Sequence, residues 1–464
     1  MTLTAYMEHL RGKKAAVLGI GVSNRPLIDL LCAYGVKVTA CDKKTEDALG
    51  TAAQELREKG VELKLGATYL DDIDADIVFR TPGMRPDLSA LEAARAKGSI
   101  VTSEMEVFFE VCPCPIVAVT GSDGKTTTTT LVYTLLKQAG YTCHLGGNIG
   151  HPLLADVPNM TASDYAVVEL SSFQLMTMQK SPKIAIVTNL SPNHLDIHKG
   201  MDEYVDAKKN IFLHQSSADR VVFNADNDIT SSFVGTAPAK TFTFSRRSDQ
   251  YHGVFCTDGI VKINTGAETI DIMQETDILL PGKHNLENYM AAIAAVWGLV
   301  SVEDIKAVAK TFKGVAHRTE LVREWRGIKF YNDSIATSPT RVIAGLRTLG
   351  KVILIAGGYD KNIPFDTLGP EIIKHAKALV LCGATADKIR KAVTDCPDYS
   401  PFALPIHEFT DFKAAVQFAA CDLARPGDIV TLSPACAAFD QFKNFEERGN
   451  YYKKLIMELD TAVQ

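Results

Sequence analysis

The residues Gly121-Ser122-Asp123-Gly124-Lys125-Thr126-Thr127 have the types and the spacing that bind nucleotide phosphates. Glycines let backbone N–H groups turn toward phosphate oxygens, while a lysine and a helix N-terminus add positive charge. The threonine hydroxyl of such loops is a Mg²⁺ ligand. The apolar run 116–119 precedes the loop and a helix-like segment, 126–138, follows it, as this chemistry requires. The usual motif has one more glycine, at the position of Val119, so the match is not strict.

Two further polar groups follow apolar runs. Glu169 ends the run 165–168, and Asn193-His194-Leu195-Asp196 comes after the run 184–188. In open parallel sheets, ligands bind beyond the C-terminal ends of strands, and hard cations prefer carboxylate oxygen. We therefore expect Glu169 to ligate Mg²⁺ near the phosphate loop. His194 is expected either to bind a metal or to polarise a substrate.

Two helix-like segments carry further polar residues. The segment 204–212 is amphipathic, and its period alone places Lys208 and Lys209 on the solvated face. The segment 282–288 begins an Ala-rich helix, and its amides at Asn285 and Asn288 either read an adenine edge or cap the helix.

A glycine turn near the N-terminus, Gly19-Ile20-Gly21-Val22-Ser23-Asn24, is similar to a dinucleotide-binding fingerprint. Asp42 ends the next strand at the spacing of a ribose-binding acid. Against this, Asn24 replaces the third glycine and would crowd the helix–strand contact. Lys43 and Lys44 suit another phosphate-bearing ligand, and the turn 81–83 adds backbone donors. The residues alone leave NAD and a sugar nucleotide as equal alternatives.

An α/β framework must position these residues. Short runs rich in Val, Ile and Leu alternate with helical segments from end to end, which is typical of parallel strands buried on both faces. The strands that we predict span 15–19, 36–41, 77–79, 116–120, 165–170, 184–189, 221–224, 352–356, 378–382 and 429–433. Shorter alternating segments with three glycines predict a small antiparallel appendage over 241–278.

Length and composition set outer bounds. A length of 464 residues favours two to four domains. We place the boundaries near Ser103 and Gly314, which gives domains of residues 1–103, 104–314 and 315–464. The net charge of -6 argues against nucleic acid as the main partner. Ten scattered cysteines without ligand spacing indicate reduced thiols in a cytosol, and no run is suited to a signal or a membrane span. We expect a cytoplasmic monomer without membrane insertion.

Taken together, these motifs resemble the Mur ligases, the ATP-dependent amino-acid ligases of peptidoglycan assembly. The resemblance covers essentially the whole chain and rests on the phosphate loop, Glu169, 193–196, Tyr204 to Lys208, His284-Asn285-x-x-Asn288 and His317-Arg318. Segments 332–337, 357–361 and 432–449 are most similar to members that add D-glutamate to UDP-N-acetylmuramoyl-L-alanine. The implied fold has a Rossmann-like N-terminal domain for the UDP substrate, a central P-loop-type mononucleotide-binding domain with a parallel sheet, and a C-terminal Rossmann-like α/β domain for the amino acid.

The resemblance also implies roles for single residues. The catalytic set would be Lys125, Glu169, His194, Lys208 and Arg318. ATP would be bound by Gly121 to Thr127 with Asn288, Arg318 and Asp333. Two Mg²⁺ sites would involve Thr126, Glu169, His194 and Lys208. Lys208 would carry a CO₂-derived carbamate. A lysine in this role lies inside the site, which reverses the interpretation of Lys208 as a solvated residue. The UDP substrate would contact Val22, Ser23, Lys43, Lys44, Thr81, Gly83, Asn148 and His194, which decides the first domain for UDP over NAD.

The implied D-glutamate pocket consists of Thr337, Lys361, Ala438 and Phe445. Two positions depart from the family pattern: Ile335 stands where many relatives carry a lysine, and Ala438 where some carry a serine that touches D-glutamate. The implied reaction passes the γ-phosphoryl group of ATP to the L-alanyl carboxylate, and the D-glutamate amine then attacks the acyl phosphate. Such an enzyme would serve cell-wall synthesis, cell shape and cell division. The alternatives are folylpolyglutamate synthase, Mur ligases for other amino acids, and a nucleotide-dependent regulator without ligase activity.

Overall fold

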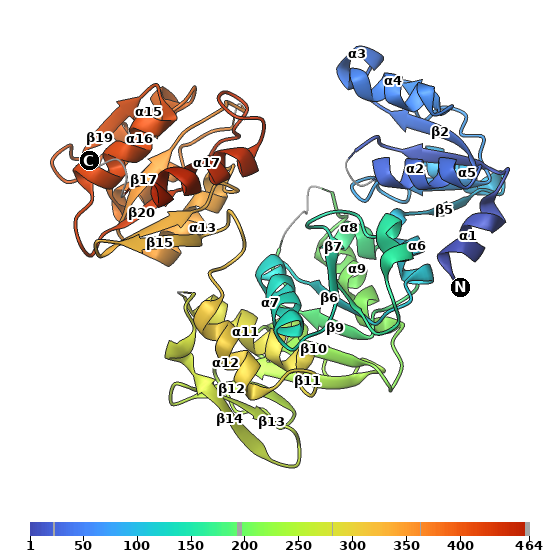
Figure 1. Cartoon of the computed structure of the whole chain (residues 1–464), viewed down its shortest axis with the longest axis horizontal. Helices are drawn as coiled ribbons and strands as arrows, with labels where there is room; N and C mark the ends of the chain where they lie inside the picture. Colours follow the sequence, from blue (N-terminus) through green and yellow to red (C-terminus); the bar gives the residue numbers. More distant parts are fainter. Residues whose placement is uncertain (22–23, 193–196, 281, 362, 460–464) are drawn as a thin grey trace. The chain divides into compact units, whose positions relative to one another are not determined.

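The computed structural model describes residues 1–21, 24–192, 197–280, 282–361 and 363–459 (Figure 1). The chain divides into two compact units, 1–278 with 283–310 and 279–282 with 311–464. The first unit contains an N-terminal and a central sheet, and the second contains one further sheet. The α/β class is therefore confirmed, while the domain boundaries near Ser103 and Gly314 stay predictions. No helix in the described part of the chain is long and apolar enough to cross a bilayer.

The N-terminal sheet is fully parallel, with the strand order β3-β2-β1-β4-β5 of doubly wound nucleotide-binding folds. Its strands alternate their side chains between two cores: Ala15 and Val17 pack with α1 and α2, whereas Ala16 and Leu18 pack with α5. The strands are β1 (Lys14–Leu18), β2 (Lys37–Asp42), β3 (Glu62–Leu65), β4 (Ile77–Arg80) and β5 (Ile100–Thr102). The helices are α1 (Leu3–Leu10), α2 (Arg25–Ala33), α3 (Glu46–Leu49), α4 (Thr51–Glu58) and α5 (Ser89–Ala96).

The central sheet has the order β14-β13-β12-β11-β10-β9-β6-β8-β7 and is parallel from β7 to β12. Because β6 lies between β8 and β9, the loops after these three strands share one edge of the sheet. The strands are β6 (Ile116–Thr120), β7 (Cys143–Gly147), β8 (Tyr165–Glu169), β9 (Ile184–Val187), β10 (Arg220–Asn224), β11 (Lys240–Ser245), β12 (Gly253–Thr257), β13 (Ile260–Asn264) and β14 (Thr269–Gln274). The helices are α6 (Glu104–Val111), α7 (Lys125–Gln138), α8 (Ser172–Leu175), α9 (Met201–Leu213), α10 (Asp228–Ser231), α11 (Lys283–Val296) and α12 (Val302–Thr311), with short 3-10 turns at Leu154–Asn159 and Glu275–Asp277.

The predicted antiparallel appendage over 241–278 is wrong in part. Only β12, β13 and β14 pair antiparallel, while β11 and β12 continue the parallel sheet. The buried Ala-rich helix α11 packs against β10, β11 and β12, so Phe242 and Phe244 are covered and the sheet extends instead of ending. The alternating pattern of the segment indicated strands correctly but did not show which helix covers them.

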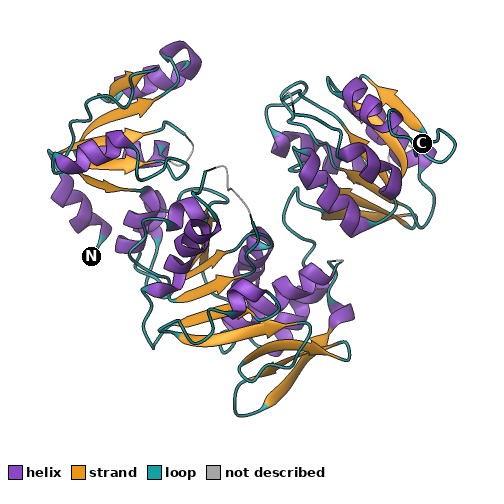
Figure 2. Ribbon diagram, turned by 180° about the vertical axis from the view of Figure 1, so that it is seen from behind, coloured by secondary structure: helices purple, strands orange, loops and turns teal. Residues whose placement is uncertain are grey.

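The C-terminal sheet has the order β15-β16-β20-β17-β18-β19 and is parallel except for the β15–β16 hairpin. Helices cover both of its faces (Figure 2), with α13 to α15 on one core and α16 and α17 on the other. The strands are β15 (Glu320–Trp325), β16 (Ile328–Asn332), β17 (Val352–Ala356), β18 (Ala376–Cys382), β19 (Ile406–Phe409) and β20 (Ile429–Leu432). The helices are α13 (Pro339–Leu349), α14 (Leu368–His375), α15 (Ala386–Thr394), α16 (Phe412–Gln417), a π-helix (Phe418–Leu423) and α17 (Phe445–Met457).

Candidate active site

The phosphate loop connects β6 directly to α7, as the sequence predicts. Gly121 and Gly124 have φ angles of +150° and +76°, in the region that favours glycine. A Cβ at Gly121 would overlap Thr188 Oγ1, and one at Gly124 would overlap Asn288 Oδ1. Val119, by contrast, is fully buried inside β6 and pairs with β8 and β9. The position of the missing glycine therefore belongs to the strand and not to the turn.

The end of β9 holds this loop in place. The backbone N–H groups of Ser122 and Asp123 donate to the carbonyl and side-chain oxygens of Asn189, at 2.8 and 3.0 Å. Thr188 Oγ1 donates to the Asp123 carbonyl at 2.6 Å. The loop is thus fixed from the adjacent strand before any ligand arrives, which reduces the ordering that phosphate binding requires.

Glu169 lies at the end of β8, next to the first turn of α7. Thr126 Oγ1 donates to Glu169 Oε2 at 2.7 Å, and Asn148 Nδ2 donates to Glu169 Oε1 at 2.8 Å. Glu169 is buried, with only 2% of its surface exposed. A hydroxyl and a carboxylate that meet at a phosphate loop are the oxygen ligands that Mg²⁺ prefers. The described residues contain no cluster of three or more His, Cys, Asp or Glu suited to a metal. Mg²⁺ commonly retains water and substrate phosphates as its other ligands, so the pair fits this cation.

Lys208 lies beneath the same edge of the sheet. It belongs to α9, is 2% exposed, and its Nζ donates to Thr120 Oγ1 at 2.9 Å. Burial and the nearby charge of Lys125 lower the pKa of Lys208 well below its usual range, and Glu169 opposes this only in part. The amphipathic period placed Lys208 on the solvated face, and that interpretation is wrong. Lys209 lies nearer the surface and pairs with Asp206 at 2.9 Å, so Lys208 alone enters the site.

Asn288 packs against the loop from α11. Its Oδ1 accepts from Thr128 Oγ1 at 3.2 Å, and its Nδ2 donates to Asn285 Oδ1 at 3.2 Å. Asn288 is buried in the second turn of α11, so it does not cap the helix. Of the two roles that the sequence left open, the structure excludes capping for Asn288.

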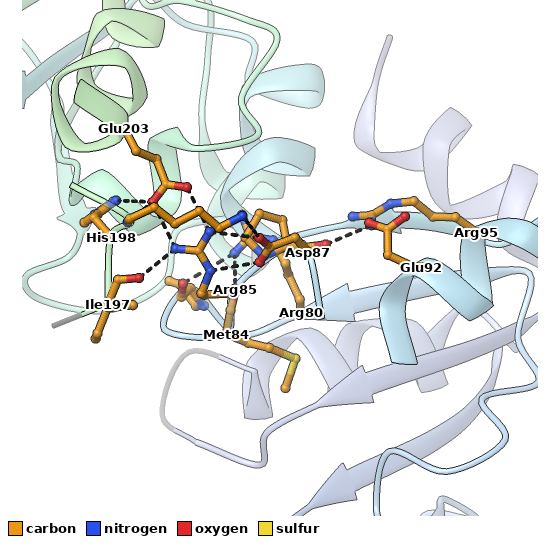
Figure 3. A network of polar contacts seen from close by, with 12 residues as sticks. Arg80, Met84, Arg85, Asp87, Glu92, Arg95, Ile197, His198 and Glu203 are labelled. Atoms are coloured by element: carbon orange, nitrogen blue, oxygen red, sulfur yellow. Dashed lines mark hydrogen bonds and ion pairs between the residues drawn. The ribbon is translucent and has the colours of Figure 1, made fainter. Parts of the chain in front are cut away.

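A polar network connects the N-terminal sheet to the site, and the sequence did not indicate it (Figure 3). Arg85, in the loop after β4, donates to both carboxylate oxygens of Glu203 at 2.9 and 2.8 Å. Glu203, in the first turn of α9, also contacts His198 Nδ1 at 3.3 Å, and the pKa of Glu203 falls to about 2, mainly through Arg85. Tyr204, the next residue, contacts Ser122 Oγ with its hydroxyl at 2.9 Å. The helix that carries Lys208 is therefore anchored both to the N-terminal sheet and to the phosphate loop.

Arg80 forms a second link to the central sheet. This arginine is 1% exposed and donates to Thr177 Oγ1 at 2.7 Å and to the Phe173 carbonyl at 3.3 Å. Both acceptors follow Glu169 closely in the chain. An arginine after an apolar strand could have been noticed in the sequence, but its partners could not, because they lie far away along the chain.

Four of the predicted UDP-binding residues, Lys43, Lys44, Thr81 and Gly83, lie at one edge of the N-terminal sheet, whereas Asn148 follows β7 of the central sheet. The chain after β1, β2 and β4 carries Gly19, Lys43 with Lys44, and Thr81 with Gly83, and these strands are neighbours. Both Asp42 carboxylate oxygens accept backbone N–H groups, from Ile20 at 2.7 Å and Lys44 at 2.9 Å. Asp42 thus holds the two loops together.

The sequence predicted that Asn24 would crowd the contact between helix and strand, and this prediction is wrong. It is 2% exposed, and its Nδ2 donates to the carbonyls of Leu18 and Gly19 at 3.2 and 3.0 Å. The amide therefore satisfies carbonyl groups at the end of β1. Val22, Ser23 and His194 lie outside the described residues.

The second unit carries the remaining residues that the sequence predicts to bind ATP, Arg318 and Asp333. Asp333 follows β16, accepts from Ser433 Oγ at 2.7 Å and from the Thr319 N–H at 3.1 Å, and is buried. Burial raises its pKa to about 6, although these hydrogen bonds and the charges of Arg318 and Arg341 act in the opposite direction. The charge of Arg318 thus acts on Asp333, while a shared role of the two residues in ATP binding stays a prediction.

The predicted acceptor residues also converge, at the adjoining ends of β16, β20 and β17. Lys361 Nζ contacts the Thr337 carbonyl at 3.4 Å, and the Phe445 carbonyl accepts from Ser334 Oγ at 2.8 Å. Ala438 is buried and offers no hydroxyl.

Arg448 fastens two of these loops together. It is 2% exposed and donates to Ser334 Oγ and to the carbonyls of Ser334, Cys436 and Ala437, each at 3.0 Å. A buried guanidinium that donates to several carbonyls stabilises irregular backbone that no sheet supports.

Comparison with known proteins identifies the family. The Mur ligase middle domain matches residues 119–296, and the Mur ligase, glutamate ligase domain matches residues 317–436. The chain belongs to the Mur ligase family.

This Mur ligase is 52% identical over 462 residues to UDP-N-acetylmuramoylalanine--D-glutamate ligase of Acetivibrio thermocellus, with 99% of each chain covered. It is 51% identical over 460 residues to the protein of the same name from Clostridium novyi, again with 99% of each chain covered. UDP-N-acetylmuramate-alanine ligase from Thermotoga maritima shares the fold at a TM-score of 0.55 and 17% identity, covering 97% of this chain and 100% of that one. The predicted family is thus confirmed.

Proposed function

We propose that this Mur ligase joins D-glutamate to UDP-N-acetylmuramoyl-L-alanine and converts ATP to ADP and phosphate. Two relatives of about 50% identity, which align over nearly their full length, are named for this activity. The observation that carries the proposal is the meeting of Thr126 with Glu169 at 2.7 Å beside the phosphate loop, with the buried Lys208 beneath them. A ligase of this kind serves peptidoglycan synthesis and acts where its nucleotide substrates are, in the cytoplasm.

The reaction must activate a carboxylate. A carboxylate repels nucleophiles and has no good leaving group, so its oxygen first attacks the γ-phosphorus of ATP and ADP departs. The D-glutamate amine then attacks the carbonyl carbon of the acyl phosphate and loses a proton. Phosphate leaves from the tetrahedral intermediate, and an amide bond remains. The stabilisation of charge on the transferring phosphoryl group is the main catalytic task in such reactions.

The residues divide this task between them. Lys125 and the loop N–H groups that do not donate to Asn189 bind the β- and γ-phosphates, and Arg318 neutralises the phosphoryl group that moves. Asp333 and Asn288 bind the nucleoside part of ATP. Thr126 and Glu169 would hold Mg²⁺, which would shield the phosphate charge. His194, outside the described residues, is assigned to a second Mg²⁺ or to the UDP substrate.

Lys208 is proposed to carry a carbamate. Its lowered pKa favours the neutral amine, whose lone pair adds to CO₂ with formation of an N–C bond and release of a proton. The product replaces a buried cation by carboxylate-like oxygens close to Glu169. Such oxygens suit Mg²⁺, whereas an ammonium repels it.

The UDP part is assigned to the edge of the N-terminal sheet, with Val22, Ser23, Lys43, Lys44, Thr81 and Gly83, and Asn148 reaches the same substrate from the end of β7. The acceptor is assigned to Thr337, Lys361, Ala438 and Phe445, where Lys361 binds the side-chain carboxylate of D-glutamate. The proposal also includes three domains, at residues 1–103, 104–314 and 315–464, and a monomeric protein.

Release of phosphate tests the proposal. The purified full-length chain is supplied with ATP, Mg²⁺, UDP-N-acetylmuramoyl-L-alanine and, one at a time, D-glutamate, L-glutamate, L-alanine, L-lysine and meso-diaminopimelate. We expect turnover that depends on both UDP-N-acetylmuramoyl-L-alanine and D-glutamate. Thr126→Val should abolish it, whereas Thr134→Val, further along α7, should leave it close to the unmodified rate. Turnover with another amino acid but not with D-glutamate would overturn the assignment.

A further inference from the structure

Two cations flank the loop 335–337 in the proposed acceptor pocket. Arg341, in the first turn of α13, donates to the Ile335 carbonyl at 3.2 Å. Lys361, in the segment after β17, donates to the Thr337 carbonyl at 3.4 Å. Ile335 contributes only its carbonyl, so the positive charge beside it comes from Arg341. The loop is therefore bordered by positive charges from two separate elements.

Neither cation is neutralised by a carboxylate within the described part of the chain. Their neighbours are paired: Asp360 forms an ion pair with Lys388, and Arg347, further along α13, pairs with Glu371 at 2.5 Å. Among the described residues, the Arg341 and Lys361 side chains donate only to neutral carbonyls. A carboxylate ligand would readily replace these carbonyls because it forms stronger, charge-assisted hydrogen bonds.

Arg341 lies on the part of α13 that is close to Asp333. Gly345, one turn further along the same face of α13, lies so close that a Cβ there would be 3.1 Å from Asp333 Oδ2. The charge of Arg341 also acts on Asp333, since it opposes the rise in the pKa of that buried carboxyl. Arg341 is thus located between the residue assigned to ATP and the loop assigned to D-glutamate.

We propose that Arg341 binds the α-carboxylate of the acceptor while Lys361 binds its side-chain carboxylate. The inference rests on the proposed function. The α-carboxylate and the attacking amine share one carbon atom, and the amine must reach an acyl phosphate that forms at ATP. Arg318, which is assigned to the transferring phosphoryl group, acts on the same Asp333 carboxyl as Arg341 does, so the α-carboxylate lies on the side of Arg341. A guanidinium suits this task because its planar N–H groups match both oxygens of a carboxylate.

Acceptor analogues separate this role from a structural one. Steady-state kinetics of the full-length chain are measured with D-glutamate, with D-isoglutamine, whose α-carboxylate is an amide, and with D-glutamine, whose side-chain carboxylate is an amide. Arg341→Ala should lower kcat/KM for D-glutamate roughly 10- to 100-fold, mainly through KM, because a charge-assisted contact is lost. It should leave the activity with D-isoglutamine nearly unchanged, so that discrimination against the α-amide disappears.

The controls use the same helix and the opposite cation. Arg341→Lys should restore part of the lost affinity for D-glutamate, and Arg347→Ala should behave as the unmodified chain. Lys361→Ala should instead remove discrimination against D-glutamine. Equal losses with D-glutamate and D-isoglutamine in Arg341→Ala would overturn the proposal, as would a raised KM for ATP with an unchanged KM for D-glutamate. An unmodified chain without D-glutamate turnover would overturn the proposed function itself, before any variant is compared.

Discussion

Lys208 Nζ lies 2.9 Å from Thr120 Oγ1, the hydroxyl of the last residue of the strand that ends in the phosphate loop. The contact places an amine with a lowered pKa directly under the phosphate site. A permanent ammonium there would be buried at a considerable free-energy cost. The position is therefore suited to a lysine whose charge is removed by chemistry, and this can be tested in several ways.

Lys208→Ala should reduce kcat at least ~100-fold, because the oxygens proposed on this side chain would no longer stabilise the phosphoryl transfer. Formate or acetate, added in the millimolar range, should restore part of the rate by filling the vacated space with a carboxylate. The matched control is Lys209→Ala, which loses only its surface pair with Asp206 and should keep its activity. A fully active Lys208→Ala variant would remove this lysine from the mechanism.

Lys208→Met should stabilise the first unit while it inactivates the enzyme. A buried lysine whose pKa is lowered binds fewer protons than the unfolded chain, so folding opposes its protonation at every pH below about 10. Removal of the amine removes that cost, and the gain should grow as the pH falls from 9 to 7. Thermal unfolding in CO₂-free buffer measures it. A less stable variant across this range would contradict the inferred loss of charge.

Asp333 should make the stability of the second unit depend on pH. Its pKa is raised to about 6, above the value near 3.9 of an unfolded aspartate. Between these values the folded chain binds the extra proton, so the free energy of unfolding should fall as the pH rises from 3 to 7, by about 3 kcal/mol in total. Asp333→Asn should lose this slope, whereas Asp366→Asn, at an exposed site, should keep it. Denaturant titrations of the three proteins across this pH range provide the measurement.

Gly124→Ala should raise the KM for ATP and lower kcat strongly. An alanine there combines a positive φ with an overlap on Asn288 Oδ1. Gly140→Ala is the matched control, since Gly140 has a φ of +89° but a Cβ there meets nothing within 4 Å. Both variants store similar backbone strain of about 1 kcal/mol, and only the first should weaken nucleotide binding. Equal ATP affinities, measured by calorimetry, would argue against the close approach of α11 to the loop.

Arg85→Ala should destabilise the first unit by about 1–3 kcal/mol and reduce kcat, because Glu203 loses two charge-assisted hydrogen bonds at the start of the helix that carries Lys208. Arg57→Ala breaks a similar two-bond pair with Glu46, but that pair is 54% exposed on each side, so water screens it and its loss should change the stability far less. Unfolding and kcat are measured on both variants. If Arg57→Ala proves the more damaging change, the network of Figure 3 does not anchor α9.

Much of the fold could be predicted because its signals are local. Apolar runs such as 116–120 and 352–356 have the length and composition of buried parallel strands, and each predicted strand lies within two residues of an observed one. Short edge strands such as β5 and β19 were missed, since their exposed residues lack an apolar run. The cover of β11 and β12 by α11 could not be anticipated, because the helix follows these strands by a long stretch of chain.

The sequence by itself determined the phosphate loop, the acids and amides that follow strands, and the family, because these depend on residue types at fixed spacing. The tertiary structure decided which of these residues meet. Thr126 and Glu169 are separated by 43 positions, Thr120 and Lys208 by 88, and Arg85 and Glu203 by 118. Strand order and burial bring such pairs together, and neither is encoded in a local period. Lys208 is the clearest case. Its helical period predicted a solvated charge, whereas the tertiary structure buries it where the neutral form is more readily accommodated.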